Sequence, residues 1–285
     1  MNKFLKYLFL ISIISGAICL SSCQKEFTVE NLEPPQDSTF VLMDSNVISK
    51  VIYYDSVAGG ADVFLERTFI YDSLKRLSEI IEVEPNYNKI VTKFYYSGND
   101  SNSIGYLLTD SLDISFGIAA ERHFFTRDSQ KRLVKDSVTS NPGFFNVATY
   151  NYNSNLIKLQ RYTPPSPGNI SLWYGDATLD LNGNITKIIT SEPSMSLGDS
   201  SAFFFDNKFN PYYRLRNTTE IFNEYLVYDY ESILFNRNNI IRFYDTESGS
   251  PVLNNIIYTY NAAGYPIAAY ESNDDIYIKY IYKSL

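Results

Sequence analysis

Short runs in which hydrophobic and polar residues alternate recur from about residue 45 to the end of the chain. The last run, DDIYIKYIYK, places Ile276, Ile278, Tyr280 and Tyr282 on one face and the residues between them on the other. Alternation with a period of two is typical of a half-buried β-strand. No segment in this part of the chain has the apolar spacing of an amphipathic helix. The pattern therefore predicts an all-β protein.

A turn motif separates many of these runs. An aromatic or β-branched run ends in Asp or Asn, three turn residues follow, and the fifth residue is usually Arg, Asn or Tyr ahead of Leu, Ile or Pro. An Asp or Asn that opens a turn accepts hydrogen bonds from backbone N–H groups further along, while Gly, Asn or a Lys-Arg pair tolerates the left-handed conformation that closes a short loop. The motif predicts β-hairpins. It begins at Asp72, Asp128, Asp180, Asp206 and Asn261, with a shortened copy at Asn153.

These spacings fit a repeating unit of about 26 residues, with degenerate units near residues 96–99 and 233–239. Roughly 14 to 18 strands joined by short hairpins form an antiparallel meander, because strands that are neighbours in the sequence pair with one another. A sheet of that width does not stay flat. We expect an all-β fold, an antiparallel meander of repeated hairpins curled into a barrel-like or partly open wrapped sheet.

The hairpin motif also carries two resemblances. The grammar YD-x-x-x-R-L resembles the YD repeats of Rhs-type proteins, although the chain is far too short to form the toxin-enclosing shell associated with them. The C-terminal third, with FFFDNKFNPYY, NRNNIIRFYD and YTYNAAGYPIAAYE, resembles a family of Bacteroidota lipoproteins of unknown function that is described as having a porin-like fold. That similarity extends over about residues 45–285 and implies an architecture, because its motifs include no catalytic residues.

The N-terminus has the layout of a secretory signal. Lys3 and Lys6 precede an apolar run from about Tyr7 to Leu20, and the segment ends in LSSC at Cys23. This ending resembles a bacterial lipobox, which implies that Cys23 is acylated and that residues 1–22 are removed. An ordinary signal peptide or an N-terminal membrane helix is the alternative, but the apolar run is short for a membrane span.

The residues after Cys23 predict a location and a tether. Gln24 in place of Asp resembles the rule for passage to the outer membrane, and QKE partly resembles the surface-export signal of Bacteroidota lipoproteins. Residues 23–38 are polar, contain Pro34 and Pro35, and favour an extended tether. We expect a lipid anchor in the outer membrane, on its periplasmic or cell-surface face, followed by a single repeat-built β domain over residues 39–285.

Composition excludes several kinds of partner and chemistry. The chain has 24 basic and 32 acidic residues, and no basic cluster offsets the net charge of −8, so nucleic acid is not the expected partner. Cys19 lies in the signal and Cys23 carries the lipid, which leaves no thiol for catalysis or for a disulfide. With His123 as the only histidine, every His/Cys zinc pattern is excluded, and we expect no metal or other cofactor. A lone histidine in a strand-like run is more often a packed or surface residue than a catalyst.

Candidate chemistry beyond this is sparse. Carboxylates at Glu79, Glu82, Glu84, Asp274 and Asp275 are candidates for the acid/base pair of a glycoside hydrolase, but solvated faces and turn caps explain these acidic residues better. The segment DLNGN begins like a Ca²⁺ loop at Asp180, but Ser191 stands where the bidentate Glu belongs. Gly198-Asp-Ser superficially resembles an esterase nucleophile block, but no Asp-x-x-His follows it.

Two surface features remain as predictions. Trp173 and Tyr174, with Tyr162 nearby in the sequence, are a candidate aromatic platform for a sugar ring, while the competing interpretation places such residues in the core. Ser38, in the tether, lies in an Asp-Ser-Thr sequence that resembles the O-glycosylation motif of exported Bacteroidota proteins.

The sequence thus favours a non-catalytic envelope lipoprotein that binds a glycan or an envelope protein, or that has a structural role. The alternatives are an envelope glycoside hydrolase and an outer-membrane barrel that spans the bilayer. Charges on both faces of candidate strands, such as Glu66 and Arg67, argue against the spanning barrel.

Overall fold

The chain divides into two compact units, residues 1–41 and 42–285. The computed structural model describes only residues of the second unit: 46–55, 62–85, 88–111, 120–140, 144–166, 169–191, 200–215, 236–245, 252–273 and 275–285. Residues 1–45, which include Cys23 and Ser38, lie outside the described part of the chain.

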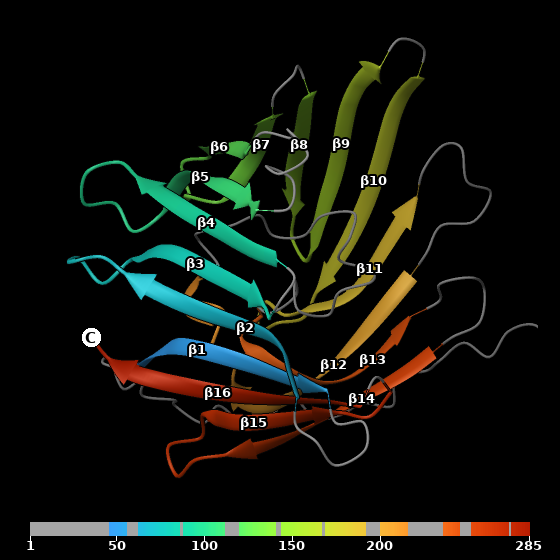
Figure 1. Ribbon diagram of the computed structural model, residues 1–285. Coiled ribbons are helices and arrows are strands. Elements are labelled where there is room, and N and C mark those ends of the chain that lie inside the picture. Colours follow the sequence, from blue (N-terminus) through green and yellow to red (C-terminus); the bar gives the residue numbers. More distant parts are fainter. Residues whose placement is uncertain are drawn as a thin grey trace, which may run out of the picture. The chain divides into compact units, whose positions relative to one another are not determined.

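The described strands form a closed antiparallel barrel of sixteen strands in sequence order, and β16 closes it against β1 (Figure 1). The closing ladder runs from Asn46 opposite Ser284 to Asp55 opposite Ile276. The prediction of an all-β meander of hairpins that curls into a barrel is confirmed. The strands are β1 (Asn46–Asp55), β2 (Asp62–Tyr71), β3 (Leu77–Glu84), β4 (Asn88–Tyr96), β5 (Ser103–Asp110), β6 (Glu121–Arg127), β7 (Leu133–Ser140), β8 (Phe144–Asn153), β9 (Leu156–Ser166), β10 (Asn169–Leu179), β11 (Ile185–Ser191), β12 (Ser200–Phe209), β13 (Asn238–Asp245), β14 (Val252–Tyr260), β15 (Pro266–Glu271) and β16 (Ile276–Ser284).

Alternation along each strand separates a buried inner face from an outer face. On β16, Ile278 and Tyr280 are buried on the inner face, and Tyr277 and Lys279 are exposed on the outer face, as the sequence pattern predicts. The hydrophobic core lies on the inner face and draws on strands all around the barrel. Fully burying one such aliphatic or aromatic side chain contributes about 1.5–3 kcal/mol. The most deeply buried large side chains of the hydrophobic core are Tyr150, Phe69, Ile48, Leu159, Ile188 and Val51.

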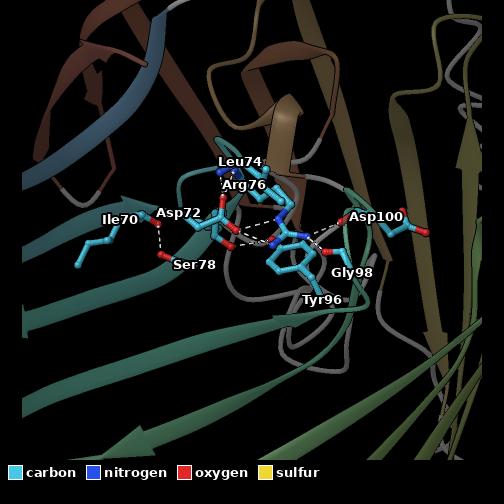
Figure 2. A network of polar contacts seen from close by, with 9 residues as sticks. Ile70, Asp72, Leu74, Arg76, Ser78, Tyr96, Gly98 and Asp100 are labelled. Atoms are coloured by element: carbon cyan, nitrogen blue, oxygen red, sulfur yellow. Dashed lines mark hydrogen bonds and ion pairs between the residues drawn. The ribbon is translucent and has the colours of Figure 1, made fainter.

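The turn motif folds as the sequence predicts. Asp72 accepts hydrogen bonds from the backbone N–H groups of Leu74 and Arg76, both at 2.9 Å, and its other carboxylate oxygen accepts from Nε of Arg76 at 2.8 Å (Figure 2). Lys75 takes a positive φ of 62°, which closes a three-residue loop with a bulge. The same two backbone bonds and the same left-handed position recur in the turns that begin at Asp128, Asp180 and Asn261, with Lys131, Gly183 and Gly264 at positive φ.

A tyrosine at the end of β4 stabilises this turn by a hydrogen bond and a cation–π contact. The hydroxyl of Tyr96 donates to the carbonyl of Leu77 at 2.6 Å, and the guanidinium of Arg76 lies 4.2 Å from the centre of the Tyr96 ring. Arg76 also donates to the carbonyls of Gly98 and Asp100 (Figure 2). Burial raises the pKa of Tyr96, so its hydroxyl remains a donor. Tyr152, Leu133 and Arg132 repeat this arrangement at the turn that begins at Asp128.

One predicted hairpin is wrong. Asp206 accepts the N–H of Lys208, as the motif requires, but β12 continues to Phe209 and the chain leaves the sheet only afterwards. The following segment, which includes the 3₁₀ turn η2 (Tyr213–Leu215), contributes to the core. Tyr212 there lies 5.8 Å from the Phe69 ring of β2 and 6.4 Å from the Tyr280 ring of β16. A side chain from the β12–β13 connection therefore packs against the inner faces of distant strands.

Candidate functional site: an inner polar cluster and an outer tyrosine face

The structure separates the three residues of the predicted aromatic platform. Trp173 on β10 is 6% exposed and belongs to the core, whereas Tyr162 and Tyr174 are 37% and 39% exposed on the outer face. Adjacent residues of a strand point to opposite sides of the sheet, so Trp173 and Tyr174 do not share a surface. The core interpretation describes Trp173, and only the two tyrosines remain together.

The outer tyrosine face consists of Tyr162, Tyr174, Gln160 and Asp176. Leu172 pairs with Tyr162 and Gln160 pairs with Tyr174, so the two tyrosines are diagonal neighbours across the β9–β10 ladder. Diagonal side chains of an antiparallel pair lie within reach of one flat ligand. Asp176 holds a loose ion pair with Lys158 at 3.8 Å, with both side chains about half exposed. This surface combines two aromatic rings with amide and carboxylate groups that hydrogen-bond to hydroxyls.

The inner polar cluster consists of His123, Glu121, Asp136, Asn146 and Arg161. His123 is 6% exposed, and its Nδ1 lies 2.7 Å from Oδ2 of the fully buried Asp136. Its Nε2 lies 3.8 Å from Glu121, whose side chain is 44% exposed at the edge of the cluster. The imidazole ring stacks on Tyr106 with 3.9 Å between ring centres and 18° between planes. These contacts fix the imidazole in position and orientation.

Strand register assembles this cluster. His123 on β6 pairs with Val138 on β7, which in turn pairs with Asn146 on β8. One row further along the strands, Asp136 pairs with Ala148, which pairs with Arg161 on β9. Trp173 follows Arg161 in the same row. Two adjacent rows of the inner face therefore place His123, Asp136, Arg161 and the amide of Asn146 around the small side chain of Ala148, and Glu121 lies in the next row.

The electrostatics of the cluster favour the ionised form of Glu121. A hydrogen bond from His123 lowers the pKa of Glu121, as do the positive charges of His123 and Arg161, against the opposing effect of burial. Asp136 accepts from His123 through one oxygen, while its other oxygen, Oδ1, is buried and has no hydrogen-bond partner among the described residues. The same is true of Oδ1 of Asn146 within that part of the chain. Two acceptor atoms on the inner face thus remain available to a donor.

The sequence does not reveal this cluster, and it predicts His123 only as a lone packed or surface residue. The signal that locates it is the alternation of β6 and β7, which puts His123 and Asp136 on the same inner face although they are 13 residues apart. A buried Asp-His pair orients an imidazole. A catalytic pair also has a nucleophile beside Nε2 of the histidine. The neighbour at Nε2 is the carboxylate of Glu121, which fits binding better than covalent chemistry.

The acidic residues proposed for a hydrolase are dispersed. Glu79 lies on the outer face opposite Lys93, whereas Glu82 on the inner face binds Arg67 at 2.7 Å. Asp275 accepts a hydrogen bond from Tyr270 at 2.7 Å. Glu84 is exposed near the end of β3, and Asp274 lies outside the described residues.

Neither the Ca²⁺ loop nor the esterase block gains support. Asp180 uses its oxygens to accept the N–H groups of Asn182 and Asn184 in a hairpin turn. Within the described ranges no group of three His, Cys, Asp or Glu side chains is placed to hold a metal ion. Gly198 and Asp199 lie outside those ranges, and Ser200 is the first residue of β12.

Comparison with known proteins identifies the fold. No protein-family model matches the sequence, and no curated protein matches it. A porin-like protein from Bacteroides vulgatus ATCC 8482 is similar in structure, with a TM-score of 0.52 and 11% identity over 85% of this chain and 100% of that one. A porin-like protein from Bacteroides uniformis ATCC 8492 gives a TM-score of 0.49 and 13% identity over 83% of this chain and 96% of the other.

The first of these similarities confirms the expectation of a porin-like fold. Membership of a lipoprotein family and kinship with YD repeats remain predictions. Among the described residues, no helix has the length and apolar character needed to cross a membrane.

Proposed function

We propose that this protein is a lipid-anchored barrel of the bacterial outer membrane that faces water and binds a glycan without transforming it. The observation that carries the proposal is the position of the hydrophobic core, which lies inside the barrel. A barrel that conducts solutes across a membrane has a polar interior and an apolar exterior. Here the arrangement is the reverse over much of the inner face.

The packing of the interior argues against a pore. Core residues come from both halves of the sheet, and Tyr212 from the β12–β13 connection touches the rings of Phe69 and Tyr280. These side chains occupy space inside the barrel that an aqueous channel would leave to water. A sixteen-strand fold that is porin-like in topology is thus compatible with a filled barrel.

The outer face argues against a membrane-spanning role. Lys50 and Glu66 form an ion pair at 2.7 Å on neighbouring strands, and both residues lie in the middle of their strands. A lysine or arginine on the lipid face of a barrel costs roughly 2–4 kcal/mol at the bilayer midplane. Further charged residues stand on the outer face within other strands: Glu79, Lys93, Arg122, Lys135, Lys158, Asp176, Lys187, Arg242 and Lys279.

The N-terminal segment supplies the membrane attachment in this account. Acylation of Cys23 places the chain on the outer membrane, on its periplasmic or its cell-surface face, and residues 24–38 act as the tether. The first strand of the barrel, β1, starts at Asn46, opposite Ser284 of β16. Ser38, if glycosylated, belongs to this tether and not to the binding surface.

The outer tyrosine face supports a glycan as the ligand. Tyr162 and Tyr174 offer rings to the C–H faces of sugars, and Gln160 and Asp176 offer hydrogen-bonding groups to hydroxyls beside them. Aromatic anchors of this kind typically contribute about 1–2 kcal/mol each, or a factor of roughly 5 to 30 in affinity.

A glycan array tests the proposal, with the full chain extracted from membranes in mild detergent and reducing-sugar release followed in parallel. We expect binding without turnover, and weaker binding for Tyr162→Ala and Tyr174→Ala. Trp173→Phe is the matched control, because Trp173 lies on the opposite face. Release of reducing sugar would instead indicate a hydrolase. No glycan binding and no sugar release would favour an envelope protein as the partner.

A further inference from the structure

The wall around Ala148 combines buried acceptors that lack partners with the smallest side chain of its row. Asp136 is 0% exposed and Asn146 is 7% exposed, so both side chains are removed from bulk water. Oδ1 of each has no hydrogen-bond partner among the described residues. Leaving a buried acceptor unpaired destabilises a folded protein, and native structures contain few such atoms.

The two acceptors are close neighbours on the same inner face. Asp136 pairs directly with Ala148, and Asn146 precedes Ala148 by two residues on the same strand, so Asn146 is diagonal to Asp136. Ala148 lies between Asp136 and Arg161 in this row, and its side chain is a single methyl group. Arg161 of β9 pairs with Ala148, so its positive charge belongs to the same row of the inner face.

The geometry points to a binding site beside Ala148 for a small neutral ligand with two O–H donors, one for Oδ1 of Asp136 and one for Oδ1 of Asn146. The occupant has to donate because both atoms accept, and it needs two O–H bonds because one O–H group makes one full hydrogen bond as a donor. It is small because Asp136, Asn146 and Ala148 are all buried, and it is neutral because Asp136, Glu121, His123 and Arg161 already provide charges of both signs. An ordered water molecule has this chemistry, and so does a pair of neighbouring hydroxyls on a small neutral sugar.

This site is separate from the outer tyrosine face and does not depend on it. Tyr162 and Tyr174 point away from the barrel interior, so their replacement leaves the wall around Ala148 unchanged. Loss of glycan binding at the outer face would therefore not affect the hydroxyl site, and failure of the hydroxyl site would not remove the proposed function.

Urea unfolding of full-length variants in mild detergent tests the site. Asn146→Leu removes the acceptor at nearly constant size, and Asn151→Leu on the outer face of the same strand is the matched control. If a hydroxyl binds Asn146, the midpoint of Asn146→Leu falls well below that of the wild type while Asn151→Leu stays near it. A midpoint for Asn146→Leu equal to or above the wild type overturns the proposal, because removing a truly unpaired acceptor relieves its cost.

A second pair of variants keeps the test decisive if Asn146→Leu does not fold. Ala148→Ser supplies a hydroxyl from the chain itself, and Ala148→Val fills the same position with methyl groups. We expect the serine variant to unfold at or above the wild-type midpoint and the valine variant to unfold below it. Equal destabilisation by both variants would mean that packed atoms fill the position, and the proposal would fail.

The same urea unfolding, repeated with glucose, galactose or N-acetylglucosamine at millimolar concentration, distinguishes a sugar hydroxyl from a water molecule. A midpoint that rises with sugar in the wild type but not in Ala148→Ser assigns the site to a sugar hydroxyl. A sugar-independent midpoint, together with the expected behaviour of the variants, assigns it to a bound water molecule.

Discussion

Replacement of Asp72 by alanine isolates the interaction on which the hairpin module depends. Its carboxylate accepts the N–H groups of Leu74 and Arg76 at 2.9 Å and binds the Arg76 side chain at 2.8 Å. The ion pair is partly shielded, with side-chain exposures of 15% for Arg76 and 23% for Asp72. Asp72→Ala removes all three contacts and leaves Arg76 with its charge unpaired against the Tyr96 ring.

The expected loss follows from these contacts. Substituting a residue whose side chain accepts backbone N–H groups at a helix N-cap costs about 1 kcal/mol, and the turn presents a comparable arrangement. Hydrogen bonds to charged groups contribute about 1.5–3 kcal/mol when they are shielded from water. Because the turn is half exposed, we expect Asp72→Ala to lower the free energy of unfolding by about 3 kcal/mol. Asp72→Asn keeps the backbone bonds, as Asn261 does in its own turn, and should lose about 1 kcal/mol.

Urea unfolding followed by circular dichroism measures these differences. Asp176→Ala is the control, since Asp176 pairs with Lys158 only at 3.8 Å on the exposed face and should cost less than about 0.5 kcal/mol. A loss for Asp72→Ala no larger than that of the control would mean that the Asp72 carboxylate does not stabilise the turn. Equal losses for Asp72→Ala and Asp72→Asn would show that the backbone bonds contribute nothing.

The same carboxylate predicts a pH dependence. Burial raises the pKa of Asp72, but the N–H groups of Arg76 and Leu74 and the Arg76 guanidinium outweigh it, so the pKa lies below its ordinary value. A lowered pKa in the folded state stabilises the protein above the unfolded-state pKa, and this contribution is lost as the pH falls through the folded-state pKa. The stability difference between wild type and Asp72→Asn should therefore shrink in acid below pH ~4. A difference that grows as the pH falls would contradict the assigned cause.

Two further substitutions test the inner face and the sheet. Asp136→Ala removes the partner of His123 at 2.7 Å and leaves a buried ring N–H unpaired; in the same unfolding assay we expect a loss of about 3 kcal/mol, and a loss below about 1 kcal/mol would contradict the pairing. Gly105→Ala places a Cβ 2.0 Å from the carbonyl oxygen of His123 at a φ of 152°, so we expect a loss above about 3 kcal/mol or failure to fold, and a near-wild-type midpoint would contradict the approach of β5 to β6.

Much of the architecture is predictable because its signals are local. The Asp or Asn that opens a turn, the residue in the left-handed position and the restart of the strand all lie within six residues, so the hairpins at Asp72, Asp128 and Asn261 appear in the sequence directly. Alternation then assigns faces, as on β16. A sheet of this width that is made of neighbouring pairs closes on itself, and closure between β1 and β16 follows without any long-range signal of its own.

What the sequence does not reveal depends on register or on distant residues. Asp206 has the local turn chemistry, but it also accepts hydrogen bonds from Asn239, 33 residues away, and the strand continues past it. The pairing of His123 with Asp136 requires the exact pairing of β6 with β7. Trp173 and Tyr174 are adjacent in the sequence, which makes them candidates for one platform, whereas alternation along the strand places them on opposite faces.

In the proposed function the barrel faces water, and only the lipid holds it to the membrane. Exchange of residues 1–23 for a cleavable signal that adds no lipid, followed by fractionation of cells, tests this directly. We expect the exchanged protein to be folded and to appear in the soluble envelope fraction, while the native protein stays with the outer membrane. Retention of the exchanged protein in the membrane, resistant to extraction by alkaline carbonate, would instead establish a spanning barrel.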